Sequence, residues 1–173
     1  EGPQGIVGRA HTQNISLEEA QTRPDDLWVA LDSVSDPGNL GTIMRTAEAV
    51  GSRGLILLGH STDPYDPTAV KASMGALFSL ELIQSDWISF LEWQKINTIN
   101  LIGTSDRAKS DYQSLAYKHP LVLLMGSERH GLGDEMQSAC DYMVFIPMEG
   151  RSDSLNLAVA TGIVLYEIYN QTR

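Results

Sequence analysis

Short runs of consecutive apolar residues alternate along the chain with stretches of helical length. The apolar runs predict strands within segments 25–34, 54–58, 79–83, 98–105, 120–128 and 142–148, and the stretches between them predict helices in 37–51, 66–78, 85–95, 132–140 and 154–169. Strands that are apolar at successive positions are buried on both faces, as in parallel sheets. The pattern therefore predicts an α/β fold with a mostly parallel sheet flanked by helices.

The carboxyl ends of the predicted strands are the places to look for a functional site. Open α/β sheets bind their ligands in the crevice beyond those ends. The loops that meet this condition follow Asp32, Ser105, Gly126 and Ile146. Three of the four carry unusual polar or glycine residues, which makes them candidates for the site.

One candidate is PGNLGTIMRTAEAVG, residues 37–51. Its large apolar residues share one helical face, whereas Thr42, Arg45 and Ala49 lie roughly opposite and Asn39 sits at the entry. A surface helix with a solvated arginine and an asparagine N-cap also explains this pattern, without any catalytic function.

A second candidate is LVLLMGSERHGLG, residues 121–133, in which a buried strand runs into Gly126 and then into Gly131 and Gly133. Glycines allow a ligand to approach the backbone closely. An ordinary strand-to-helix turn explains the same residues. The chain has no G-x-G-x-x-G sequence, so the dinucleotide-binding fingerprint is absent.

The third candidate is IPMEGRSDSLNLAVATGIVLYEIY, residues 146–169, a polar loop followed by a helix with apolar residues on nearly every side. We expect Ser154 or Asp153 to cap the helix. A helix that is apolar all round needs packing partners on more than one side. One partner is the sheet, and the other is a neighbouring helix or a second subunit. A wholly internal core helix is the alternative.

Composition narrows the classes of protein that fit. Residues 27–173 are long enough for one domain with its own core. Cys140 is the only cysteine, which suits a cytoplasmic, reducing setting, and the four histidines lack the spacing of a metal site. No apolar run is long enough to predict a membrane span. We therefore expect a cytoplasmic protein with no metal and no membrane segment.

The formal net charge of −10 argues against unaided binding to nucleic acid, because phosphate contacts need lysine and arginine. Residues 1–26 begin with a glycine-rich stretch and are predicted to be an arm or linker that follows an RNA-binding domain outside this sequence. A local basic site around the cleft is still expected from Arg45, Arg53, Arg107, Lys109, Arg129 and Arg151.

In order and in type, the three candidate segments resemble the three motifs of the SpoU (TrmH-like) branch of the SPOUT RNA methyltransferases. NLGTIMRTAEAVG is similar to the family pattern N-x-G-x-x-x-R-x-A-x-x-x-G, LVLLMGSERHGLG is similar to the second motif, and the third segment carries the I-P-M and S-L-N elements. The resemblance covers residues 27–170, nearly the whole chain.

The resemblance implies a sheet whose C-terminal part forms a deep trefoil knot. It also implies transfer of a methyl group from S-adenosylmethionine to a ribose 2′-hydroxyl of rRNA or tRNA, with rRNA slightly favoured. Family members work as homodimers, and we expect the pairing here to use the motif-one helix and the C-terminal helix.

The resemblance also assigns roles to residues. The cofactor-binding candidates are Gly126, Ile146, Leu155, Met148 and Thr104. The catalytic candidates are Arg45, Asn39, Glu128, Ser154 and Asn156. Since the first three cofactor candidates have no polar side-chain atom, we expect their backbone groups to make the hydrogen bonds.

The role of Arg45 stays open between two chemistries: acceptance of the hydroxyl proton, or binding of a phosphate with stabilisation of the developing alkoxide. The second is favoured because a guanidinium normally stays protonated. Ser154 and Asn156 are expected to line the acceptor site, and Glu128 either orients Arg45 or holds its own loop. For Ser154 and Glu128, an N-cap and a solvated turn residue are the purely structural alternatives.

Two other classes of protein remain as alternatives. One is a binding module without catalysis, against which the intact Arg45, Asn39 and Asn156 argue. The other is an unrelated nucleotide-binding α/β enzyme, against which the missing glycine fingerprint argues.

Overall fold

The computed structural model describes residues 15–173. Its strands are β1 (Leu27–Asp32), β2 (Gly54–Leu58), β3 (Glu81–Ser85), β4 (Asn100–Thr104), β5 (Ser110–Asp111), β6 (Leu121–Met125) and β7 (Tyr142–Phe145). Its helices are α1 (Pro37–Ala49), α2 (Pro67–Ser73), the 3-10 turn η1 (Ala76–Phe78), α3 (Trp87–Ile96), α4 (Asp134–Ala139) and α5 (Leu157–Thr172). The predicted strands and helices are thereby confirmed as element types, and β5 is an addition.

The strands form one sheet in the order β3-β2-β1-β6-β4-β7-β5, and every ladder between neighbours is parallel. The predicted α/β class is confirmed. The chain returns to the middle of the sheet when β6 pairs with both β1 and β4. The trefoil knot depends on how the chain threads through its own loops, which strand order does not describe, and it stays a prediction.

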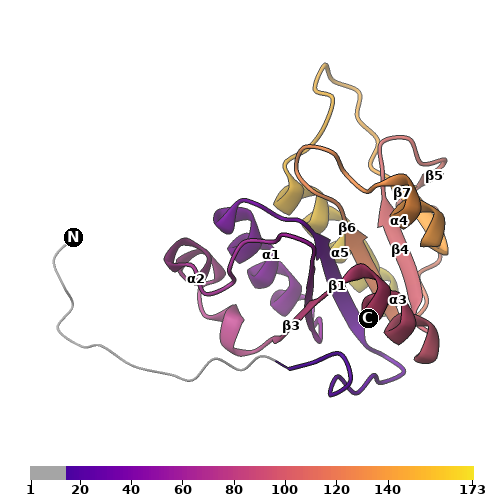
Figure 1. The fold of residues 1–173 in the computed structure, drawn as a ribbon. Coiled ribbons are helices and arrows are strands. Elements are labelled where there is room, and N and C mark those ends of the chain that lie inside the picture. The colour runs from indigo at the N-terminus through magenta and orange to yellow at the C-terminus, as the bar shows by residue number, and fades with distance from the viewer. Residues whose placement is uncertain (1–14) are drawn as a thin grey trace, which may run out of the picture.

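Two apolar layers cover the two faces of the sheet (Figure 1). One contains the buried side chains of α1, α2 and α5, with α1 packed against both of the others. The other contains Phe90 and Trp93 of α3 together with Leu17 and Ala20, which precede β1. The part of the predicted arm that the structure describes therefore includes two buried apolar residues. Residues 1–14 of that arm lie outside the described residues.

The predicted wheel of α1 is confirmed, since Leu40, Ile43, Met44 and Ala47 are fully buried and Arg45 is exposed. The predicted helix in 66–78 is instead divided. Met74 and Gly75 take left-handed backbone angles, with φ of 50° and 96°, and separate α2 from η1. Gly75 accepts that conformation readily because it has no Cβ. Within residues 15–173, no helix is long and apolar enough to cross a bilayer.

Candidate active site

A cavity of about 590 Å³ lies at the carboxyl edge of the sheet. Its walls are the loops after β4, β6 and β7, together with the first turns of α5. This volume is within the usual range for small-molecule sites, about 300–1,000 Å³. The cavity therefore forms where the sequence predicted a ligand site.

All five predicted cofactor-binding residues line this cavity: Thr104, Gly126, Ile146, Met148 and Leu155. They come from three separate loops. No hydrogen bond recorded within residues 15–173 uses the backbone groups of Gly126, Ile146 or Leu155. Backbone donors and acceptors that are free at a cavity wall fit a ligand with a polar edge, as the sequence predicted for these positions.

Gly126 fixes the shape of one wall. A Cβ built on it would overlap the carbonyl carbon and oxygen of Gly131 and the amide nitrogen of Leu132. The loop after β6 therefore folds back directly onto Gly126, and the Gly131 amide donates to the Ser127 carbonyl at 3.0 Å. Gly131 has a φ of 64°, which favours glycine at this turn.

Replacement of Gly126 by alanine is expected to push the 127–132 loop away from the cavity. Overpacking of this kind costs about 1–3 kcal/mol, which lowers the melting temperature of a chain of this size by about 2–12 °C. Ligand affinity should fall together with stability. Differential scanning calorimetry measures the change, and Gly150→Ala is the matched control because a Cβ there meets nothing within 4 Å and Gly150 does not line the cavity. Equal melting temperatures for the two variants would contradict this account of the wall.

Three predicted catalytic residues from the three motif segments meet in space. The Asn156 Nδ2 donates to Asn39 Oδ1 at 2.9 Å, and the Asn39 Nδ2 donates to Glu128 Oε1 at 3.2 Å. Glu128 lines the cavity, whereas Asn39 and Asn156 are not among its lining residues. The fold therefore joins residues that are 89 and 117 positions apart in the chain.

The Glu128 carboxylate also holds the loop between β1 and α1. It accepts hydrogen bonds from the backbone N–H and the hydroxyl of Ser35 and from the N–H of Asp36, each at 3.2 Å. Desolvation raises the pKa of Glu128, but hydrogen bonds from backbone amides and from the Asn39 side chain outweigh it and the pKa is lowered. Of the two roles predicted for Glu128, the structure supports the holding of a loop.

Ser35 and Asp36 were not among the predicted site residues, although both contact Glu128. Asp36 is the N-cap of α1, and its Oδ1 accepts from the Asn39 N–H at 2.6 Å. The alternative in which Asn39 caps this helix is therefore excluded. An aspartate directly before a proline is a recognised helix-start signal that would have identified the cap. With Asp36 in that position, the Asn39 side chain is free to reach Glu128.

The expected cap of α5 is also wrong. Asn156 caps this helix, and its Oδ1 accepts from the N–H groups of Ala158 at 2.9 Å and Val159 at 3.2 Å. Ser154 and Asp153 instead line the cavity from the preceding loop. The purely structural alternative for Ser154, an N-cap, is therefore excluded.

Arg45 lies apart from the cavity. It is exposed on the outward face of α1 and does not contribute to the cavity lining. Within residues 15–173, the recorded ion pair joins Arg53 to Glu81, so Arg45 has no carboxylate partner in this part of the chain. The expectation that Glu128 orients Arg45 is therefore not met.

Arg45 shares its surface with an exposed apolar stripe on α5. Gly162 faces Thr46 of α1, since a Cβ on Gly162 would lie 3.6 Å from the Thr46 methyl. On the outward side of α5, Val159 is 51% exposed and Tyr166 is 48% exposed. The helix was predicted to need packing partners on more than one side, and in the single chain Val159 and Tyr166 leave an uncovered apolar face on α5.

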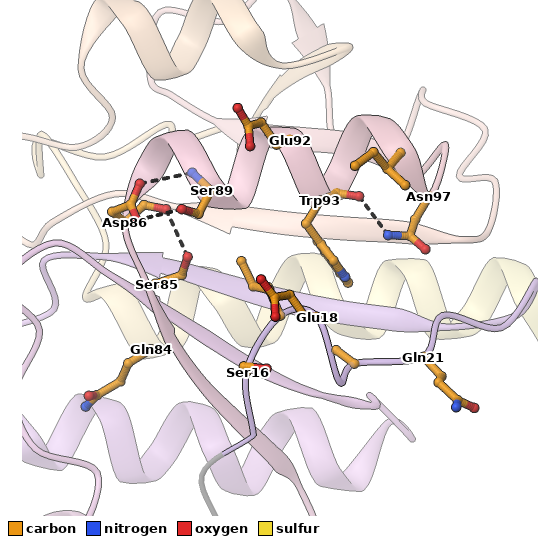
Figure 2. Close-up of a pocket in the computed structure, with 13 residues that line it drawn as sticks. Ser16, Glu18, Gln21, Gln84, Ser85, Asp86, Ser89, Glu92, Trp93 and Asn97 are labelled. Carbon is orange, nitrogen blue, oxygen red and sulfur yellow. Dashed lines mark hydrogen bonds between the residues drawn. The ribbon is translucent and has the colours of Figure 1, made fainter.

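A larger hollow, of about 980 Å³, lies elsewhere on the molecule, between residues 16–21 and α3 (Figure 2). Its charged lining residues are Glu18, Asp86 and Glu92, all acidic, and it contains none of the predicted site residues. It also lacks arginine, whereas Arg107 and Arg129 line the smaller cavity. The smaller cavity at the strand ends is therefore the candidate active site.

The basic residues predicted around the cleft are only partly gathered there. Arg107 and Arg129 line the cavity, and neither forms a recorded ion pair within residues 15–173. Arg53, by contrast, is paired with Glu81 at the amino ends of β2 and β3, so its inclusion in a basic site at the cleft is wrong. Asp106, Glu128, Asp134 and Asp153 also line the cavity, so its carboxylates outnumber the two guanidinium groups of Arg107 and Arg129.

Comparison with known proteins decides the family. The model of the SpoU rRNA Methylase family matches residues 26–166. The chain belongs to this family. The match spans β1 to the middle of α5 and so contains all ten predicted site residues of this SpoU-family chain.

Relatives of this SpoU-family chain are similar over nearly its whole length. A 23S rRNA (uridine(2479)-2′-O)-methyltransferase from Streptomyces viridochromogenes is 36% identical over 99% of the chain and 62% of its own length. A 23S rRNA (guanosine-2′-O-)-methyltransferase RlmB from Pseudomonas aeruginosa is 33% identical over 97% of the chain and 71% of its own length.

Solved structures agree with the sequence relatives. The AdoMet-bound rRNA methyltransferase from Sinorhizobium meliloti superposes with a TM-score of 0.90 at 40% identity, over 93% of this chain and 62% of that protein. The SpoU methyltransferase AviRb from Streptomyces viridochromogenes, in complex with AdoMet, gives a TM-score of 0.84 at 38% identity, over 90% of this chain and 61% of AviRb. The chain thus spans about three fifths of the length of several of its relatives.

Proposed function

We propose that this chain is the catalytic domain of an RNA methyltransferase that methylates a ribose 2′-hydroxyl, in rRNA rather than tRNA, with S-adenosylmethionine as the methyl donor. The observation that carries the proposal is the cavity at the strand ends, whose walls hold the five predicted cofactor-binding residues. Relatives named as 23S rRNA 2′-O-methyltransferases support both the reaction and the preference for rRNA.

The cavity fits S-adenosylmethionine in size and in chemistry. Its volume of about 590 Å³ suits a nucleoside with an amino-acid tail. The free backbone groups of Gly126, Ile146 and Leu155 can pair with the polar edge of an adenine. Apolar side chains such as Ile146, Met148 and Leu155 provide the walls that a flat ring needs.

When bound, S-adenosylmethionine supplies a methyl group that is already electrophilic on its sulfonium. The protein has to align the ribose oxygen with that methyl group and favour loss of the hydroxyl proton. We propose that Ser154, which lines the cavity without a hydrogen bond of its own in residues 15–173, contacts the acceptor ribose. Arg45 binds the RNA phosphate next to that ribose and stabilises the developing alkoxide through its permanent positive charge.

We propose that Arg45 serves a neighbouring subunit. It is exposed on α1, which packs against α5 and its uncovered apolar face, and it does not line the cavity of its own chain. We propose that a second copy of the chain covers this face. Burial of Val159 and Tyr166 against the partner would stabilise the dimer through loss of apolar surface from water. Each active site would then combine a cavity from one subunit with an arginine from the other.

Contact with RNA is proposed for the cations at the cavity. Arg107 and Arg129 line it without recorded carboxylate partners, so their guanidinium groups are available to phosphate oxygens. A chain of net charge −10 gains little affinity for RNA from its surface as a whole. The cytoplasmic location and the absence of a metal remain predictions that accompany this substrate class.

Isothermal titration calorimetry with S-adenosylmethionine tests the proposal, and Gly126→Ala is the variant with a damaged wall. We expect saturable binding of one molecule per chain by the wild type, and binding weakened at least about tenfold by the variant, equivalent to 1.4 kcal/mol. The same wild-type protein should transfer labelled methyl groups to ribose in rRNA. Absence of cofactor binding would contradict the proposal, and binding without methyl transfer to any RNA would favour a binding module instead.

A further inference from the structure

A chain of hydrogen bonds runs from the N-terminus of α5 to the cavity wall. The N–H groups of Ala158 and Val159 donate to Asn156 Oδ1, Asn156 Nδ2 donates to Asn39 Oδ1, and Asn39 Nδ2 donates to Glu128 Oε1. The three donor–acceptor distances along the shortest path are 2.9, 2.9 and 3.2 Å. Each bond points the same way, from helix to carboxylate.

The direction of this chain is fixed by the chemistry of its two ends. The first turn of a helix offers only N–H donors, so Asn156 has to present its oxygen to α5 and its NH₂ group to Asn39. An ionised carboxylate only accepts, so Asn39 has to present its NH₂ group to Glu128. The oxygen of Asn39 then accepts from the NH₂ group of Asn156. Neither side-chain amide can rotate by 180° without the loss of at least two hydrogen bonds.

Electrostatics favour the same direction. The N-terminus of a helix carries a partial positive charge, and Glu128 is the negative end of the chain. Aligned hydrogen-bond dipoles between them polarise one another. The carboxylate at the end also accepts from Ser35 and Asp36, so its charge fixes the loop before α1 as well.

We propose that Glu128, Asn39 and Asn156 are positioning residues that form one polarised relay, through which the cavity wall after β6 sets the position of α5 and of the loop before it. This inference rests on the proposed function for its effect on methyl transfer. Leu155 and Leu157, which line the cavity, flank Asn156 in sequence. Alignment of the relay therefore holds the second wall at the correct distance from the first. The same α5 presents the apolar face, so the relay links the cofactor cavity to the subunit interface.

The variant Asn156→Asp separates a relay from a simple helix cap. Aspartate is as good an N-cap as asparagine and suits the positive helix terminus, so α5 keeps its cap. The variant, however, places carboxylate oxygens toward Asn39. Asn39 then has carboxylate acceptors both at its oxygen and at its NH₂ group. Its NH₂ group can face only one of them, either Glu128 or the carboxylate introduced at position 156. We expect kcat/KM for methyl transfer to fall at least about tenfold, which equals 1.4 kcal/mol, whereas a cap-only role predicts no loss.

A second substitution should restore the series of hydrogen bonds, with donors and acceptors exchanged. In the double variant Asn156→Asp/Glu128→Gln, the glutamine NH₂ group donates to Asn39 Oδ1, and Asn39 turns over to donate to the new aspartate. Every link between positions 128 and 156 is then satisfied again, although the Asp36 N–H, which shares Glu128 Oε1 with Asn39, loses its acceptor. We expect the double variant to be at least about tenfold more active than the product of the two single effects predicts, which is the signature of coupling between positions.

The experiment measures kcat/KM, S-adenosylmethionine affinity and the free energy of unfolding for the wild type, both single variants and the double variant. Gln84→Glu is the control, because it adds the same charge at an exposed amide on β3, three strands away from β6. Coupling in turnover and in unfolding supports the relay, and additive effects in both overturn it. The unfolding measurement needs no substrate, so a wild type that transfers no methyl group but shows the coupling would refute the proposed function and leave the relay intact. Should Glu128→Gln prove too unstable to purify, Asn39→Asp alone places a carboxylate against Glu128, and an unchanged unfolding free energy would then overturn the relay.

Discussion

Replacement of Arg45 by alanine is expected to lower kcat for methyl transfer by about 100-fold or more, the usual cost of losing a group that stabilises developing charge. The affinity for S-adenosylmethionine should stay within about twofold of wild type, because Arg45 does not line the cavity. Single-turnover methyl transfer and calorimetry on the same preparations measure the two quantities. Arg45→Lys keeps the charge but loses the planar fork, so near-normal turnover by this variant would contradict any role that depends on guanidinium geometry.

Mixed dimers show which subunit Arg45 serves. An Arg45→Ala chain keeps its cavity, and a Gly126→Ala chain keeps its arginine. In a heterodimer of the two, an arginine that acts across the interface leaves one complete site, in the Arg45→Ala subunit. Differently tagged chains, co-expressed and purified by both tags, should therefore regain up to half of wild-type activity. If the mixed dimer is no more active than its parents, Arg45 acts within its own chain.

The substitution Val159→Asp is expected to convert the proposed dimer to a monomer and to abolish methyl transfer. Val159 is half exposed on the apolar face of α5, and burial of an unpaired charge at an interface costs several kcal/mol. Light scattering coupled to size-exclusion chromatography gives the mass. The matched control is Ile88→Asp, because Ile88 is an equally apolar residue that is 69% exposed, but on α3 and against the other face of the sheet.

The same variant tests whether assembly and the cofactor cavity are linked. Val159 donates its N–H to Asn156, at the start of the relay, so separation of the subunits is expected to weaken S-adenosylmethionine binding as well. A monomer that binds the cofactor with wild-type affinity would break the link between the two. A variant that remains dimeric would place the interface elsewhere on the molecule.

The framework of the fold was predictable because it depends on local patterns. Continuous apolar runs such as Leu121–Met125 have only one good environment, a strand covered on both faces. The buried face of α1 followed from helical periodicity in the same way. The two-residue strand β5 was missed because Ser110 and Asp111 carry no periodic signal and depend on β7 for their pairing.

The site was predictable only in part, for a physical reason. Gly126, Ile146 and Leu155 were placed correctly on the cavity because the resemblance to the second and third family motifs assigned them to the cofactor site. The partner of a polar side chain, by contrast, is set by tertiary structure. Asn39 and Asn156 are each compatible with a local cap, and nothing in a linear sequence states that Asn156 caps α5 and donates to Asn39 while Asn39 donates to Glu128. The position of Arg45 outside its own cavity likewise emerged only from the fold.

We propose different tasks for the polar residues of the three motifs. Ser154 lines the cavity and would contact the ribose, Arg45 is exposed outside the cavity and would serve the partner subunit, and the residues of the relay would hold the walls. A reaction whose donor is already activated asks mainly for alignment and for stabilisation of charge. The relay would provide the first, and an arginine with permanent charge would provide the second.

Quantitative mass-spectrometric mapping of 2′-O-methylated riboses tests the central claim most directly. RNA is taken from cells that carry the intact gene, the gene with Arg45→Ala, or no gene. The account predicts that one ribose in rRNA is methylated in the first strain and unmethylated in the other two, with tRNA unchanged. Identical 2′-O-methylation of rRNA and tRNA in all three strains would contradict it.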